Sequence, residues 1–231
     1  QNLGSDIGSG QDKTTTGICI ILGGTVTATN GKFGTNAGIK VNEDGTLEVY
    51  GDLTLPADIT IPEGKTLIIP EGATLTVPEG ITLTNNGTII NNNGFTNNGT
   101  VINNGTFINN GNLVETNHNY TNGFCICGEY ELAELKDGVY QIKNAGNLCW
   151  FANYVKSGHN TVNAVLTNDI DFGGRNFIAI GTSSNPYQGT FDGCGYKITV
   201  NQSGSSDVAV FGIVQACTIK NLTVTGTIET A

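Results

Sequence analysis

The chain has 231 residues, a formal net charge of −10 and only 13% charged residues, with 33 glycines and 5 prolines. An acidic surface repels phosphate, so this charge argues against nucleic acids and anionic membranes as partners. The low charge and the content of aliphatic residues argue against a disordered chain. No apolar run approaches the ~20 residues that span a bilayer. The composition predicts a folded, turn-rich chain with few helices.

Residues 1–17 are polar and glycine-rich, which predicts a linker or an arm. The chain starts at Gln1 and contains no methionine, which is typical of a mature protein whose signal peptide has been removed. The many Asn, Thr and Gly residues favour an exported protein at an extracellular or cell-surface location. The chain stops at Ala231 just after a strand-like segment, and an open sheet end invites pairing. We therefore expect it to be part of a longer chain.

From Ile18 onward, short segments with β-branched residues at period two are bounded by Gly, Asn or Asp, which predicts short strands. The first of them lie at 25–28, 39–41, 46–50 and 53–55. A repeat then becomes explicit, first with Pro-Glu-Gly corners and then with Asn-Asn-Gly corners. The corner glycines are Gly64, Gly72, Gly80, Gly87, Gly94, Gly99, Gly105 and Gly111.

Each segment between two corners has only three or four strand residues and cannot bury its apolar side chains alone. Stacking successive segments buries a continuous column, which is the logic of a solenoid. Three segments predict a coil of roughly 20–24 residues, with coils spaced by ~4.8 Å. Asparagines at equivalent corners should then stack into ladders that hydrogen-bond side chain to side chain. An antiparallel sandwich or meander is the alternative, because hairpins also favour Asn-Gly turns.

The pattern changes between 117 and 160. Residues 139–142 form a strand-like segment, and residues 144–158 predict a helix with apolar residues on one face and Gly158 as its C-terminal cap. The apolar positions are Leu148, Phe151, Ala152 and Val155. We expect this helix to cap or plug the coil, or to mark a boundary.

Strand-like segments return from 161 to the end, at 164–166, 170–172, 177–180, 189–193, 197–200, 208–212 and 218–224. Within them, Phe211-Gly212-Ile213-Val214 followed by Ile219-Lys220-Asn221-Leu222 resembles the glycine-rich GLUG motif of bacterial cell-surface β-helix proteins. The resemblance covers about residues 138–228. It implies a right-handed parallel β-helix like the pectate-lyase fold, at a cell-surface or secreted location. It implies no reaction, because that fold carries lyases, hydrolases, adhesins and passive stalks.

The six cysteines permit three disulfides in any of 15 pairings. They are Cys19, Cys125, Cys127, Cys149, Cys194 and Cys217. The Cys125-Ile126-Cys127 segment could form half of a zinc site with His118 or His159, but its spacing is not that of the usual zinc knuckle. We therefore predict no resident metal, and interpret the cysteines as small buried side chains, some of them paired.

An enzyme on this fold would need polar groups that converge in a groove, such as paired carboxylates or calcium-binding aspartates beside a basic residue. Asp169 and Asp171 lie two residues apart and would face the same side of a strand. Asp192 lies on a later strand, and Arg175 follows in a Gly-Gly-Arg turn. These four residues are the candidate catalytic residues, and the three aspartates are candidate calcium ligands. We favour the other interpretation, in which they are turn and strand-end residues of the repeat.

The sequence thus predicts a polar arm over 1–17 and a single all-β domain over 18–231, a right-handed parallel β-helix with a short helical insertion. Its parts are Asn/Gly/Thr-rich repeats (18–116), a helix-bearing insertion (117–160) and GLUG-like repeats (161–231). The expected function is structural or adhesive, with a glycan or a surface protein as partner and with Tyr120, Phe124, Tyr130, Trp150 and Tyr187 as stacking surfaces. The alternative is a polysaccharide lyase or glycoside hydrolase. No cofactor is expected. Calcium would be a cofactor only in the enzyme alternative.

Overall fold

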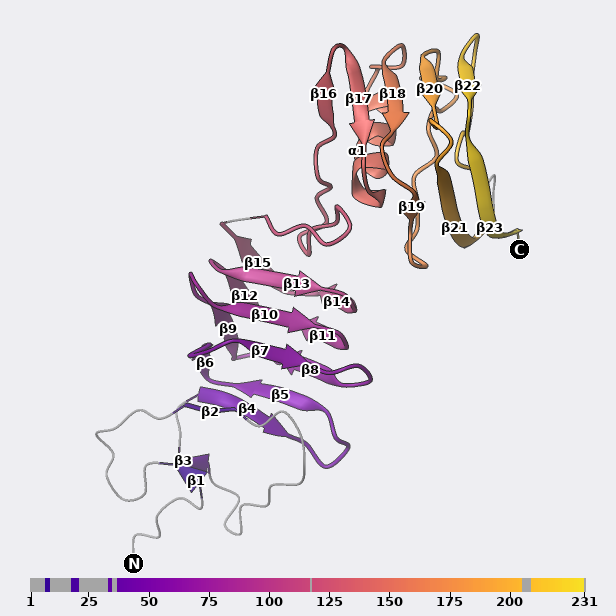
Figure 1. Cartoon of the computed structure of the whole chain (residues 1–231). Helices are drawn as coiled ribbons and strands as arrows, with labels where there is room; N and C mark the ends of the chain where they lie inside the picture. Colours follow the sequence, from indigo (N-terminus) through magenta and orange to yellow (C-terminus); the bar gives the residue numbers. More distant parts are fainter. Residues whose placement is uncertain are drawn as a thin grey trace, which may run out of the picture. The chain divides into compact units, whose positions relative to one another are not determined.

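The computed structural model describes residues 7–8, 18–20, 33–34, 37–116, 118–204 and 209–230 (Figure 1). Its contacts divide the chain into two compact units, 1–121 and 122–231. The sequence predicted one domain over 18–231 with a change of pattern at 117, close to this division. Most of the predicted arm over 1–17 and the segment at 25–28 lie outside the described residues.

The first unit consists of short strands that run in chain order around a solenoid (Figure 1). Its strands are β1 (Ile7–Gly8), β2 (Ile18–Ile20), β3 (Phe33–Gly34), β4 (Ala37–Val41), β5 (Leu47–Tyr50), β6 (Asp52–Thr54), β7 (Ile59–Ile61), β8 (Thr66–Ile69), β9 (Thr74–Val77), β10 (Thr82–Asn85), β11 (Thr88–Asn91), β12 (Gly94–Asn97), β13 (Thr100–Asn103), β14 (Thr106–Asn109) and β15 (Asn112–Glu115).

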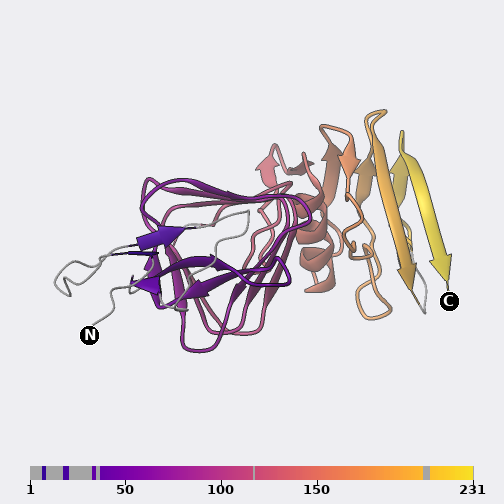
Figure 2. The ribbon, with the colours of Figure 1, turned by 90° about the horizontal axis from the view of Figure 1, so that it is seen from below.

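From β5 to β15, every third strand joins the same sheet in parallel, so the coil has three faces. The sheets run in the orders β13-β10-β7, β14-β11-β8-β5-β4-β2 and β15-β12-β9-β6. Seen from below, the coils appear as nested loops (Figure 2). The predicted parallel β-helix is therefore confirmed, and the antiparallel sandwich is excluded as the architecture of this unit. One antiparallel pair, β4 with β5, begins the regular coils.

From β7 onward, the coil shortens along the chain. Ile59 pairs with Leu83, Leu67 with Ile89 and Leu75 with Phe95, which are separations of 24, 22 and 20 residues. From β10 onward, the strands pair at a constant separation of 18 residues, as in Thr82 with Thr100. The predicted 20–24 residues are right for the Pro-Glu-Gly coils and too long for the Asn-Asn-Gly coils.

The cause of the shortening lies in the second inward-facing position of each strand. That position is aliphatic in β7 to β9, as in Ile61, Ile69 and Val77, and it is asparagine in β10 to β12. The buried carboxamide of Asn85 accepts a hydrogen bond from the backbone N–H of Gly87, two residues later, at 3.1 Å. This Asx-type turn makes a tighter corner than Pro-Glu-Gly. Asn91 and Asn97 repeat it at the next two corners.

The predicted asparagine ladders are confirmed, and there are two kinds. Inside the coil, the Nδ2 groups of Asn85 and Asn91 donate to Oδ1 of Asn103 and Asn109, both at 2.7 Å. Outside the coil, the neighbouring asparagines form bonds of 3.0 and 2.9 Å between consecutive coils. The outer pairs are Asn104 with Asn86 and Asn110 with Asn92. In the Asn-Asn-Gly region, consecutive coils are thus bonded through side chains as well as through the backbone.

The second unit has two sheets and the one helix of the described residues. Its elements are β16 (Glu134–Lys136), β17 (Val139–Ile142), α1 (Ala145–Lys156), β18 (Asn163–Leu166), β19 (Ile170–Asp171), β20 (Thr190–Asp192), β21 (Lys197–Gly204), β22 (Thr218–Lys220) and β23 (Thr223–Thr230). The sheets run β16-β17-β18-β20-β22 and β19-β21-β23. Only β16 with β17 is antiparallel.

The predicted helix is confirmed as α1, with Asn144 as its N-cap. Oδ1 of Asn144 accepts from the N–H of Asn147 at 2.8 Å, which satisfies one of the unpaired donors of the first turn. At the other end, Gly158 has a φ of +105° and donates to the carbonyl of Val155, while His159 donates to Tyr154. This is a Schellman ending. The four predicted apolar positions are all buried in the core of the unit.

Two predicted strands are absent. Residues 177–180 and the described part of 208–212 form only an isolated bridge, between Ile180 and Phe211. In addition, the sequence did not predict strands at β1, β3, β10, β12, β15 and β16. None of the helices in the described part of the chain is long and apolar enough to cross a membrane.

Candidate functional site

Asp169 and Asp171 lie at strand ends, where each carboxylate accepts a hydrogen bond from a backbone N–H. Oδ1 of Asp169 accepts from the N–H of Lys197 at 3.0 Å, and the Lys197 ammonium lies 3.7 Å from Oδ2. Oδ1 of Asp171 accepts from the N–H of Gly173 at 2.8 Å, which closes the Gly-Gly turn. Both contacts are those expected of structural acids.

Among the candidate acids, Asp192 has the most hydrogen-bond and ion-pair partners. Its Oδ1 accepts from the N–H of Cys194 at 2.9 Å and from Nδ2 of Asn221 at 3.0 Å. The Lys220 ammonium lies 3.2 Å from Oδ2. These interactions, led by the Cys194 N–H, lower the pKa of Asp192 to about 2. A general acid needs a pKa near the working pH, so this carboxylate is unsuited to that role.

Arg175 lies over an aromatic ring: its guanidinium carbon is 5.0 Å from the centroid of Phe124. Its backbone N–H donates to the carbonyl of Phe172 in the same turn. Within residues 118–204 and 209–230, the side chains of Asp169, Asp171 and Asp192 do not bring three potential ligand atoms together as a metal site requires. The structure therefore gives these four residues separate local partners.

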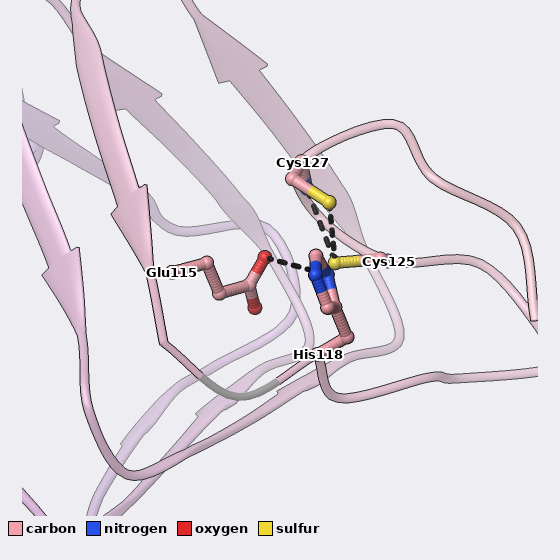
Figure 3. Close-up of side chains that lie close together, drawn as sticks. All are labelled: Glu115, His118, Cys125 and Cys127. Carbon is pink, nitrogen blue, oxygen red and sulfur yellow. Dashed lines mark hydrogen bonds and ion pairs between the residues drawn. The ribbon is translucent and has the colours of Figure 1, made fainter.

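Four other side chains, Glu115, His118, Cys125 and Cys127, each offer one atom that can bind a metal ion. Figure 3 draws them as sticks. Glu115 and His118 belong to the first unit, and the two cysteines belong to the second. Each pair has a geometry of its own.

The Glu115 and His118 pair lies at the end of the asparagine ladder. Glu115 stands 18 residues after Asn97, at the position where the inner ladder has asparagine elsewhere. Its Oε1 accepts from Nδ2 of Asn97 at 3.0 Å, and its Oε2 lies 4.0 Å from Nδ1 of His118 (Figure 3). The ladder thus ends in a carboxylate beside an imidazole.

The Cys125 and Cys127 pair forms a tight turn at the start of the second unit. The two sulfurs are 2.8 Å apart, and the backbone N–H of Cys127 donates to Sγ of Cys125 at 3.4 Å (Figure 3). The N–H of Gly128, which has a φ of +91°, closes the turn by donating to the carbonyl of Cys125 at 3.1 Å. Cys125 is buried and Cys127 is exposed.

The remaining cysteines have other surroundings. Cys149 is buried on α1, Cys194 is exposed and Cys217 is half-buried, and none of the five cysteines with described side chains is in a disulfide. The side chain of Cys19 lies outside the described ones. Burial raises the pKa of the Cys149 thiol to about 11, so it matches the predicted small buried side chain.

The aromatic candidates are mostly used inside the protein. Tyr187 is fully buried, and its hydroxyl donates to the carbonyl of Val162 at 3.0 Å, so it cannot offer a stacking surface. Trp150 is half-buried and stacks on Tyr154 at 5.1 Å. His159 also stacks on Tyr154, with 3.8 Å between the two ring centroids. Tyr120 is 37% exposed.

Comparisons of the chain with protein-family models, with curated proteins and with solved structures find no match. The resemblance to GLUG-type surface proteins therefore stays a prediction from the sequence. Function has to be argued from the fold and from the side chains described above.

Proposed function

We propose that this chain is a structural or adhesive segment of a bacterial cell-surface or secreted protein, and that its flat outer faces contact glycans or the host matrix. The observation that carries the proposal is the asparagine ladder inside the first unit. In the Asn-Asn-Gly region, inward-facing carboxamides bond one coil to the next in addition to the backbone. Such a column suits the display of a fixed surface.

The outer faces support the adhesive part of the proposal. On the sheet of β8, β11 and β14, Thr66, Thr88 and Thr106 stand in register, and Ile68, Ile90 and Ile108 form a second outward column beside them. The two columns repeat hydroxyl and aliphatic groups at the ~4.8 Å spacing of the coils. A repeated array of this kind suits a repetitive polymer such as a polysaccharide.

A glycan array with the purified chain, with and without calcium, tests the proposal when bound polysaccharides are also assayed for cleavage. We expect binding without cleavage. Ile90→Lys, at the centre of the Thr/Ile face, should abolish binding, and Thr84→Lys on the neighbouring face is the matched control. Calcium-dependent cleavage that is lost in Asp171→Ala would replace the proposal with the enzyme alternative.

A further inference from the structure

We propose that Cys125 and Cys127 form a thiol–disulfide exchange site, in which the two thiols close to a disulfide within one turn when a small-molecule disulfide oxidises them. Both residues belong to the second unit, and the site needs no group from the first. Neither residue belongs to the Thr/Ile face, so the exchange site and the adhesive function do not depend on each other. The spacing of the cysteines in the sequence left this pairing open among 15.

The backbone of a short hairpin holds the two cysteines in place. Phe124 and Tyr130 pair as an antiparallel bridge at its base. Inside that bridge, the N–H of Cys125 donates to the carbonyl of Glu129 at 3.0 Å, and the N–H of Gly128 donates to the carbonyl of Cys125 at 3.1 Å. Gly128 has a φ of +91°, a conformation that glycine adopts at little cost. The turn is therefore fixed by main-chain bonds that do not involve either sulfur.

The two side chains meet across this turn (Figure 3). Sγ of Cys125 lies 2.8 Å from Sγ of Cys127 and accepts a hydrogen bond from the backbone N–H of Cys127 at 3.4 Å. A disulfide bond is about 2.05 Å long, so the two sulfurs need only a small approach to bond. The other cysteines with described side chains lie elsewhere in the second unit: Cys149 on α1, Cys194 after β20 and Cys217 before β22. Proximity therefore favours the pairing of Cys125 with Cys127.

The different exposure of the two sulfurs gives them different roles. Cys127 is exposed and Cys125 is buried, so an external disulfide R–S–S–R meets Cys127 first. The thiolate of Cys127 attacks one sulfur of R–S–S–R, the S–S bond breaks, and one R–S⁻ leaves. The sulfur of Cys125 loses its proton, attacks Sγ of Cys127 in this mixed disulfide and expels the second R–S⁻. The two cysteines lose two electrons, and the two protons they release are taken up by the two R–S⁻ groups.

The test uses the full chain, reduced, freed of metal with a chelator and of reductant by gel filtration, and then incubated with oxidised glutathione. After quenching with acid, the remaining thiols are alkylated and the digested protein is analysed by mass spectrometry. We expect the peptide that contains residues 125–127 to lose the mass of two hydrogen atoms and to carry no alkyl group. Cys194, an exposed thiol in another turn, is the matched control and should carry glutathione as a mixed disulfide.

Two serine variants separate the roles of the sulfurs. Cys125→Ser removes the sulfur that expels the second thiol, so Cys127 should keep glutathione as a stable mixed disulfide. Cys127→Ser removes the exposed sulfur, so the buried Cys125 should stay a free thiol. A mixed disulfide that persists on Cys127 in the wild type would overturn the proposal. So would a disulfide of either residue with another cysteine, or free thiols at both positions under conditions that modify Cys194.

Discussion

Nδ2 of Asn85 donates to Oδ1 of Asn103, 2.7 Å away in the next coil. The same Nδ2 also donates to the carbonyl of Thr106 at 2.9 Å, while Oδ1 of Asn85 accepts from Gly87. A single buried carboxamide therefore satisfies the corner of its own coil and binds the coil after it. Buried polar groups of this kind stabilise only when every member is paired, and here the repeat itself supplies the partners.

Asn85→Ala should destabilise the first unit by about 1–3 kcal/mol, because it leaves the Gly87 N–H and the Thr106 carbonyl without this buried partner. Chemical denaturation followed by circular dichroism measures the free energy of unfolding. Asn86→Ala, which removes a member of the exposed outer ladder, is the matched control and should change stability by less than about 0.5 kcal/mol. Equal effects of the two substitutions would contradict a special role for the inner ladder.

Gly105→Ala should cost more than Gly72→Ala, although both are corner glycines. A Cβ on Gly105 would lie 2.0 Å from the carbonyl oxygen of Gly87 in the coil before it, and a backbone atom cannot move away cheaply. Gly72 has a φ of +82° but open space around it, so its alanine should cost only the roughly 1–2 kcal/mol of left-handed backbone. Thermal unfolding of both variants makes the comparison. The reverse order would mean that coil spacing is adjustable at this corner.

Asp192→Asn should lower the stability of the second unit at neutral pH. The folded-state pKa of about 2 lies below the ordinary value of 3.8, so the native state favours the ionised carboxylate. That contribution is complete above pH 3.8 and is lost as the pH falls toward 2. The difference between wild type and variant should therefore narrow in this interval. Carboxyl NMR titration gives the pKa directly, and a midpoint near 3.8 would contradict the hydrogen-bond network.

Cys149 should resist alkylation in the native protein, because it is 1% exposed and burial raises the pKa of its thiol to about 11. The thiolate is the reactive species, so both access and ionisation are lacking. Mass spectrometry of labelled peptides should show that Cys149 is modified only when the unit unfolds, while exposed Cys194 is modified in the native state. Labelling of both at similar rates would show that α1 opens locally.

Much of the first unit could be predicted because its sequence repeats its own corners. The Gly72 and Gly105 corners mark where strands end, and the asparagines beside them predict the ladders. Strand β12 was missed because Gly94 begins it and only Phe95 is apolar. The 18-residue coil was also missed, because the tightening depends on a side chain that accepts a backbone N–H, which spacing alone does not show.

The candidate sites were less predictable. The pairing of Asp192 with Asn221 joins residues 29 apart, and local spacing gives no sign of it. Glu115 is the one acid at an inner-ladder position. The sequence shows this only once the 18-residue register is known. The Cys-x-Cys segment was noticed and set aside on its spacing. The hydrogen bond from the Cys127 N–H to Sγ of Cys125 depends on the turn geometry.

The constant 18-residue register has a genetic consequence. Eighteen codons encode one complete coil, so a replication slip of that length would add or remove one coil of ~4.8 Å and leave the composition of all three faces unchanged. A slip of six codons would instead turn every later strand onto the neighbouring face. Variants of this gene that differ in length within the Asn-Asn-Gly region should therefore differ by multiples of eighteen codons.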